Sequence, residues 1–149
     1  MNQHALHRHT VADRLHEHRE LVLRIHRKTD QLAMLSDRMI RVGGSVIEPS
    51  SANPDAITND IQMIDDLEAE IATLGDTRRI ERARLESLSN QLQSDLQRKV
   101  IEAYYYYGLP WCDVAMLVYH QNHASDRRNC GEAKSRAISI MEVYDAKVR

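Results

Sequence analysis

The chain has 149 residues and a net charge of −2; 42% of the residues are hydrophobic, with no Phe and a single Trp. This length allows one ordinary domain or two small ones, and the scarcity of large aromatic residues favours packed helices over a β-sandwich. No apolar run approaches the roughly 18 to 20 residues that cross a bilayer, and the N-terminus lacks a signal-peptide core. We therefore expect a cytoplasmic protein with no membrane partner.

The charge is distributed unevenly along the chain. Residues 1–54 carry 8 basic and 6 acidic side chains, residues 55–96 carry 4 and 10, and residues 97–149 carry 8 and 6. An acidic segment is repelled by phosphate, so any surface that faces nucleic acid must come from one end of the chain. The negative sum alone does not exclude DNA.

The first 42 residues predict an N-terminal helix that Thr10 caps and that ends near Val42. His18 and Thr29 interrupt its apolar stripe, which suits a helical hairpin at least as well as a long coiled coil. Residues 43–54 are rich in Gly, Ser and Pro and predict a flexible linker. The stripe itself consists of Val11, Leu15, Val22, Ile25, Leu32, Leu35 and Met39.

Residues 55–93 predict a coiled-coil-like helical segment, with Asn53 as its cap and Pro54 at its first position. Its seam alternates steps of three and four, and Gly75-Asp76 leaves open whether the helix breaks there. An unbroken helix of this length needs a partner, so we expect a homo-oligomer, with a dimer as its simplest form. The apolar seam positions are Ile57, Ile64, Leu67, Ile71, Leu74, Leu85, Leu88 and Leu92.

Residues 94–149 predict a helix-turn-helix domain. Ser94 and Gln97 fit a capping box, the helix that follows ends at Gly108, and Pro110 opens a short helix. The last helix has small residues where it must cross the short helix closely, as a helix-turn-helix requires. The expected fold is therefore all-α: an N-terminal helical hairpin or coiled coil followed by a C-terminal helix-turn-helix.

The stretch Val100–Val118 reads VIEAYYYYGLPWCDVAMLV. This pattern, after a segment with spaced leucines, resembles the ArpU-like and RinA-like phage transcriptional regulators, which are similar to region four of bacterial sigma factors. The resemblance covers roughly residues 61–144 and is specific across Val100–Val118. It implies a phage or prophage origin, action in a bacterial host cell, and control of late-gene transcription alongside host RNA polymerase.

The start of the last helix contains the candidate DNA-binding residues. Gln121, Asn122 and Ser125 are alternative caps, and each shifts which side chains face DNA. With Asn122 as the working cap, we expect Arg127 and Arg128 to read guanine and Lys134 and Arg136 to hold phosphates. The competing interpretation is a solvated basic helix face. The full candidate set is Gln121, Asn122, His123, Ser125, Arg127, Arg128, Asn129, Lys134 and Arg136.

Other site types find little support in the sequence. The N-terminal histidines 4, 7, 9, 16 and 18 include no pair spaced i, i+4, so we expect no metal site. Cys112 and Cys130 predict reduced core thiols. Successive tyrosines at 104–107 point in different directions, so at least half should be core rather than base-stacking residues. No phosphate loop, nucleophile motif or zinc-protease motif is present, so we expect no enzyme and no cofactor.

The sequence is compatible with two functions. The first is a sequence-specific transcription regulator that binds double-stranded DNA through the helix-turn-helix. The alternative is a helical protein-interaction module, an adaptor or inhibitor that binds a host factor or RNA polymerase, in which the helix-turn-helix only packs. The net negative charge suits the alternative. Salt-dependent DNA retention distinguishes the two.

Overall fold

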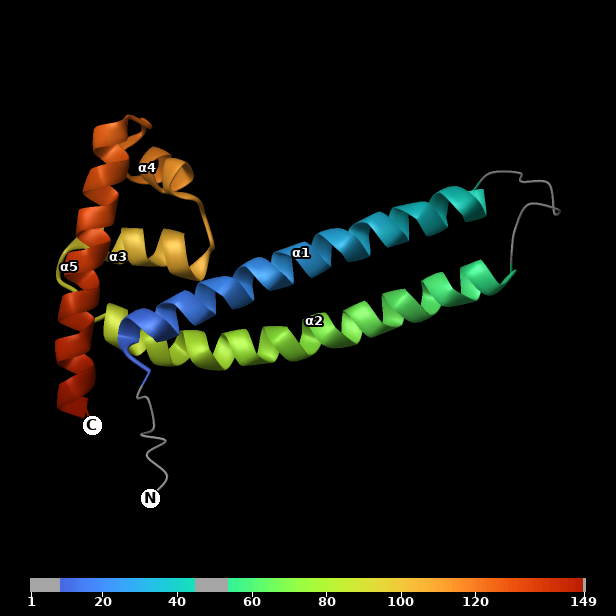
Figure 1. The fold of residues 1–149 in the computed structure, drawn as a ribbon, viewed down its shortest axis with the longest axis horizontal. Coiled ribbons are helices and arrows are strands. Elements are labelled where there is room, and N and C mark those ends of the chain that lie inside the picture. Colours follow the sequence, from blue (N-terminus) through green and yellow to red (C-terminus); the bar gives the residue numbers. More distant parts are fainter. Residues whose placement is uncertain (1–8, 45–53, 149) are drawn as a thin grey trace, which may run out of the picture. The chain divides into compact units, whose positions relative to one another are not determined.

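The computed structural model describes residues 9–44 and 54–148, and every regular element in these ranges is a helix (Figure 1). This confirms the all-α prediction. None of the helices described is both long and apolar enough to cross a membrane. In chain order the elements are α1 (Val11–Gly44), α2 (Pro54–Ser89), α3 (Asp95–Ile101), the π-helix η1 (Glu102–Tyr106), α4 (Trp111–Tyr119) and α5 (Ala124–Val148).

The starts of the first two long helices follow local rules. Thr10 caps α1 as predicted: its Oγ1 accepts the Asp13 N–H at 3.1 Å, and Asp13 Oδ2 accepts the Thr10 N–H at 3.3 Å. The helix continues to Gly44, beyond the expected end at Val42. α2 begins at Pro54 as predicted, whereas its expected cap Asn53 and most of the expected linker lie outside the described residues.

Helix α2 runs through Gly75-Asp76 without a break. A single glycine inside a helix costs about 1 kcal/mol relative to alanine. The uninterrupted backbone hydrogen bonds, and the burial of Leu67 before this point and Leu85 after it, outweigh that cost. The open question about this position is therefore answered in favour of one continuous helix.

The residues divide into two compact units that do not follow chain order. One unit joins the described residues up to Val22 with those from Arg78 onward, and the other is Leu23–Thr77. The boundaries expected from sequence lay near 42, 54 and 93, between elements. In the structure α1 and α2 each run from one unit into the other.

Leu23–Thr77 is an antiparallel helical hairpin. Lys28 Nζ lies 2.8 Å from Glu70 Oε1, and Arg38 lies 2.5 Å from Asp60 Oδ1. From the first ion pair to the second, the residue number rises by ten on α1 and falls by ten on α2, so the two helices run in opposite directions. Surface ion pairs stabilise little, so the buried Ile25, Leu35 and Leu67 must hold the two helices together. The hairpin alternative thus describes this part of the chain.

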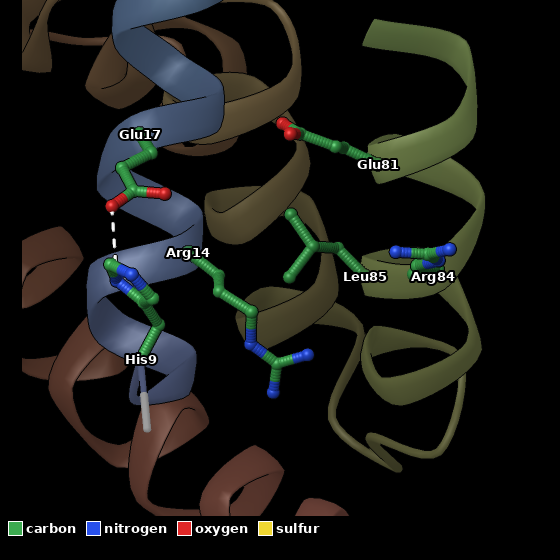
Figure 2. Close-up of a pocket in the computed structure, with 6 residues that line it drawn as sticks. All are labelled: His9, Arg14, Glu17, Glu81, Arg84 and Leu85. Atoms are coloured by element: carbon green, nitrogen blue, oxygen red, sulfur yellow. Dashed lines mark ion pairs between the residues drawn. The ribbon is translucent and has the colours of Figure 1, made fainter. Parts of the chain in front are cut away.

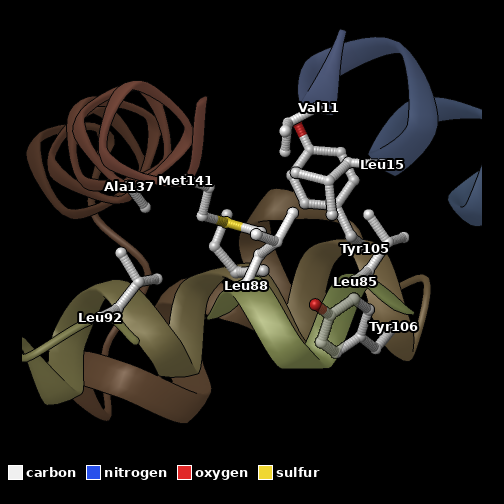
Figure 3. Close-up of a cluster of buried hydrophobic side chains, with 10 residues drawn as sticks. Val11, Leu15, Leu85, Leu88, Leu92, Tyr105, Tyr106, Ala137 and Met141 are labelled. Atoms are coloured by element: carbon white, nitrogen blue, oxygen red, sulfur yellow. The ribbon is translucent and has the colours of Figure 1, made fainter. Parts of the chain in front are cut away.

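The other unit is built on an apolar cluster that gathers side chains from distant parts of the sequence (Figure 3). The seam residues Leu85, Leu88 and Leu92 are buried within it, so they are not available to a second copy of the chain. Self-association stays a prediction that concerns the earlier seam positions. The cluster consists of Val11, Leu15, Leu85, Leu88, Leu92, Ile101, Tyr105, Tyr106, Ala137 and Met141.

A buried histidine lies beside this cluster. His18 is fully buried, its ring meets Tyr106 edge-on at 5.7 Å between centroids, and Tyr106 donates a hydrogen bond to Ser89 Oγ at 2.9 Å. Burial, and then the charges of Arg82 and Arg78, lower the pKa of His18 to about 4. Its ring nitrogens have no hydrogen-bond partner among the residues described. His18 is therefore neutral in the folded protein at pH 7.

We predict that the protein loses stability as the pH falls from about 6.5, the usual histidine pKa, toward 4. The unfolded chain takes up a proton at His18 in this range and the folded chain does not, so acid favours unfolding. The slope from one proton is up to about 1.4 kcal/mol per pH unit. Urea unfolding at several pH values measures it. His18→Leu should flatten the profile, whereas the exposed control His16→Leu should not; equal profiles for parent and His18→Leu would contradict the assignment.

Candidate nucleic-acid interface

Helices α4 and α5 pack on α3 and η1 around a second apolar cluster, formed by Val100, Ala103, Val114, Ala115, Cys130 and Ala133. Ala115 on α4 and Ala133 on α5 are both buried, in agreement with the expected small residues between these helices. Neither cysteine forms a disulfide, and burial raises the pKa of the Cys130 thiol, which keeps it protonated. Cys112 is only half-buried.

The helix before the site ends in a π turn that the sequence did not predict. Tyr107 N–H donates to Glu102 O at 3.0 Å, and Leu109 N–H donates to Ala103 O at 3.0 Å. Gly108 follows with a φ of 71°, which glycine adopts without a steric cost. Within the tyrosine run, Tyr105 and Tyr106 are buried, Tyr104 is half-buried and Tyr107 is exposed.

The turn between α4 and α5 is closed by an acidic side chain from inside α5. His123 O accepts the Arg127 N–H at 3.1 Å, so His123 is the residue that flanks the helix, and α5 begins at Ala124. Asp126 Oδ2 accepts the His123 N–H at 3.1 Å, and Asp126 Oδ1 accepts from the Gln121 amide at 3.3 Å. The working choice of Asn122 was wrong by one residue, because the cap comes from Asp126 and not from a side chain before the helix.

The same turn contains a non-glycine residue in the left-handed region. His120 has a φ of 58°, and its N–H donates to Met116 O at 3.0 Å. A side chain with a Cβ costs roughly 1 to 2 kcal/mol in this conformation. The turn geometry is thus maintained against local strain by the helices on either side.

We predict that His120→Gly stabilises the protein by about 0.5 to 1 kcal/mol, since glycine removes the Cβ clash at the cost of a more flexible unfolded chain. Thermal or urea unfolding measures this change. His120→Ala is the matched control, because alanine keeps the Cβ and gains nothing. A glycine variant no more stable than the alanine variant would show that the turn is unstrained.

The candidate residues lie mostly on the surface, but they face different ways. The buried stripe of α5 includes Asp126 and Cys130, and at 3.6 residues per turn Arg128 points about 200° from Asp126, directly away from the core. Arg127 points about 100° from Asp126. Its Nη1 donates to Asn122 Oδ1 at 2.7 Å and to Asn122 O at 3.2 Å. Gln121, Asn122, His123, Ser125, Arg127, Arg128, Asn129 and Arg136 are exposed.

Lys134 and Arg136 flank the outward face on opposite sides. Relative to Arg128, Lys134 lies about 120° to one side of α5 and Arg136 about 80° to the other. Lys134 is half-buried, with its Nζ 5.9 Å from the centroid of the Trp111 ring, and Arg136 is exposed. The structure thus places one cation at the centre of this face and one toward each edge.

The rest of the outward face is small or acidic. Ala124, Gly131 and Ser135 all point within about 60° of Arg128. A Cβ added at Gly131 would meet nothing within 4 Å, so packing inside this chain does not require the glycine. Glu132, one turn after Arg128 and exposed, was missed because only basic and capping residues were sought. A helical wheel centred on the buried Asp126 and Cys130 would have found it.

A separate groove of about 210 Å³ lies between the start of α1 and the end of α2 (Figure 2). On its α1 side His9 pairs with Glu17 at 3.1 Å, and Arg14, Glu81, Arg84 and Leu85 complete its lining. Arg14 also pairs with Asp145 at 2.9 Å. The charges of both signs in this groove balance one another, so it offers no strong site for an anion or a cation.

The histidines do not form a cluster where the structure describes them. His4 and His7 lie outside those residues, His9 and His16 are exposed, and His18 is buried. No group of three or more His, Cys, Asp or Glu in the described ranges is arranged to hold a metal ion.

No protein-family model matches the chain, and no curated protein or solved structure shows significant similarity to it. The resemblance of Val100–Val118 to ArpU-like and RinA-like regulators therefore stays a prediction.

Proposed function

We propose that the protein binds double-stranded DNA in a sequence-specific manner through α4 and α5 and thereby regulates transcription. One observation carries the proposal: the exposed start of α5 presents Arg128 directly away from the core, amid small side chains. The major groove of B-DNA, about 12 Å wide, admits an α-helix, and recognition helices read bases with their first turns. Small neighbours let the backbone of α5 approach the base edges.

Most of the candidate residues have a role in this proposal. Arg128 donates to guanine O6 and N7, and Glu132 on the same face accepts from cytosine N4. Lys134 and Arg136 reach phosphates on the two sides of the groove. Gln121 and Asn122 act indirectly, because they bond to Asp126 and Arg127 and hold the turn. Ser125 and Asn129 remain available for further contacts.

The local charge is compatible with DNA despite the negative total. Between Arg127 and Arg136 there are four basic side chains and one acidic one, the exposed Glu132. The other nearby carboxylate, Asp126, comes just before this stretch and is buried. The acidic residues of the central chain fall largely in the Leu23–Thr77 hairpin, which is a separate unit. A phosphate therefore meets a locally positive surface at α5.

The wider proposal takes its biological context from the resemblance. It places the protein in a phage or prophage, acting in a bacterial cell on late-gene promoters, with host RNA polymerase as a further contact. Regulators with one recognition helix per chain commonly bind two half-sites as dimers, so dimerisation on DNA belongs to the same proposal. Two half-sites about 10 bp apart, or a multiple of this spacing, are expected in that case.

We predict that the affinity for DNA falls steeply with salt, because binding releases counterions from the contacted phosphates. Fluorescence anisotropy with a selected duplex between 50 and 200 mM salt measures the slope. Lys134→Ala and Arg136→Ala should each weaken preferred and random DNA alike and flatten the logarithmic slope by about one. Arg27→Ala, exposed in the hairpin, is the control and should leave the slope unchanged.

We also predict that Arg127→Ala and Arg128→Ala differ in their effect on sequence specificity. Arg128→Ala should lose about 1 to 3 kcal/mol of affinity for the preferred sequence and much less for random DNA, since it removes a base contact. Arg127→Ala should lose less discrimination, because its guanidinium bonds to Asn122. Binding of both variants to a duplex selected from a random library provides the comparison. If Arg127→Ala relaxes specificity and Arg128→Ala does not, α5 faces DNA differently from the geometry above.

One observation favours the alternative of a protein-interaction module. Met116 and Leu117 on α4 are 49% and 55% exposed, so this helix has an apolar outer surface next to the turn. A folded parent chain that shows no salt-dependent binding to any DNA would favour this alternative. Loss of RNA polymerase capture in a folded Leu117→Asp variant would then locate the contact.

A further inference from the structure

We infer that Arg19 of α1 is a positioning residue for α4 and α5, and that it acts through Tyr104 and Trp111. The effect on DNA affinity rests on the function proposed above; the effect on the arrangement of α4 and α5 does not. Arg19 lies far from these helices in sequence, but the first turns of α1 belong to the same compact unit.

Arg19 bonds to the chain on both sides of Gly108, once in η1 and once in the connection that leads to α4. Its Nε donates to Tyr104 O at 3.0 Å, and its Nη2 donates to Leu109 O at 3.4 Å. Carbonyls at the end of a helix lack partners within that helix and favour a nearby cation. One guanidinium thus spans the stretch that contains Gly108 and sets where α4 can begin.

The same guanidinium starts a stack that reaches α5. Its central carbon lies 4.2 Å from the centroid of the Tyr104 ring. Tyr104 stacks on Trp111 at 4.0 Å with an interplanar angle of 13°, and Lys134 Nζ lies 5.9 Å from the Trp111 ring. The stack therefore joins four elements in order: α1, η1, α4 and α5.

These successive contacts let Arg19 position α4 and α5, beyond stabilising the fold as any packed side chain does. Trp111 is the first residue of α4, so its ring fixes the rotation of that helix, and Lys134 is one of the proposed phosphate contacts. Arg19 itself is half-buried, with its donors directed at protein carbonyls. Loss of Arg19 should shift α4 and α5 without removing any contact to DNA.

The test compares Arg19→Ala and Arg19→Lys with the parent chain, with Arg27→Ala as a matched control exposed on the same helix. All are compared at a temperature where circular dichroism shows each variant folded. Three quantities are measured: accessibility of the single Trp111 to acrylamide, amide exchange in α4 and the turn to α5, and affinity for the selected duplex at several salt concentrations.

We expect Arg19→Ala to make Trp111 more accessible, to speed exchange in α4, and to weaken DNA binding by at least about fivefold, the low end of typical coupling between sites. The salt slope should stay as in the parent, because no phosphate contact is lost. Arg19→Lys keeps the charge but not the forked donors, so it should recover only part of the affinity. If Arg19→Ala does not fold, the same three measurements on Arg19→Lys test the inference.

Two results would overturn the inference for a parent that binds DNA. Unchanged affinity in folded Arg19 variants means that the residue only stabilises the fold, and a salt slope lowered by about one means that it touches phosphate directly. If the parent binds no DNA, the proposed function fails instead. The positioning role is then decided by Trp111 accessibility and exchange alone, and parent-like values in Arg19→Ala reject it.

Discussion

The apolar cluster that joins Leu15 of α1, Leu85 and Leu88 of α2 and Met141 of α5 holds the two ends of the chain in one unit. Burying a leucine side chain stabilises by about 1.5 to 3 kcal/mol, and truncating one in a core typically costs about 2 to 5 kcal/mol. The helix-turn-helix segment contributes only part of this core. Residues 94–148 therefore depend on the first turns of α1 and the end of α2 for their shape.

That shared core also gives the proposed DNA-binding face its direction. Cys130, Ala133, Ala137 and Met141 are buried on one side of α5, and Arg128 on the opposite side is exposed. Asp126 adds a second constraint at the start of the helix, where its carboxylate bonds to His123 and Gln121 and closes the turn. Packing and capping together turn Arg128 outward and leave Arg127 beside Asn122.

Local signals predicted much of the secondary structure. The caps at Thr10 and Ser94 are present, since Ser94 Oγ accepts the Gln97 N–H at 3.3 Å, and Pro54 starts α2. Where signals conflicted, the outcome depended on the surroundings. Gly75 would break α2 only if no packing stabilised the helix before and after it. The turn before α5 offered three plausible cap residues, but the capping hydrogen bond is made by Asp126. Neither outcome can be found from residue type alone.

By itself the sequence determined the all-α class, the ends of most helices and the set of exposed polar residues near residues 121–136, because these depend on side-chain periodicity and on contacts a few residues apart. Only the tertiary structure decided which helices share a core, that Leu85, Leu88 and Leu92 are buried inside the chain, and that Arg19 bonds to Tyr104 and Leu109. These contacts join residues far apart in sequence. Their formation depends on how whole helices pack, which no local pattern specifies.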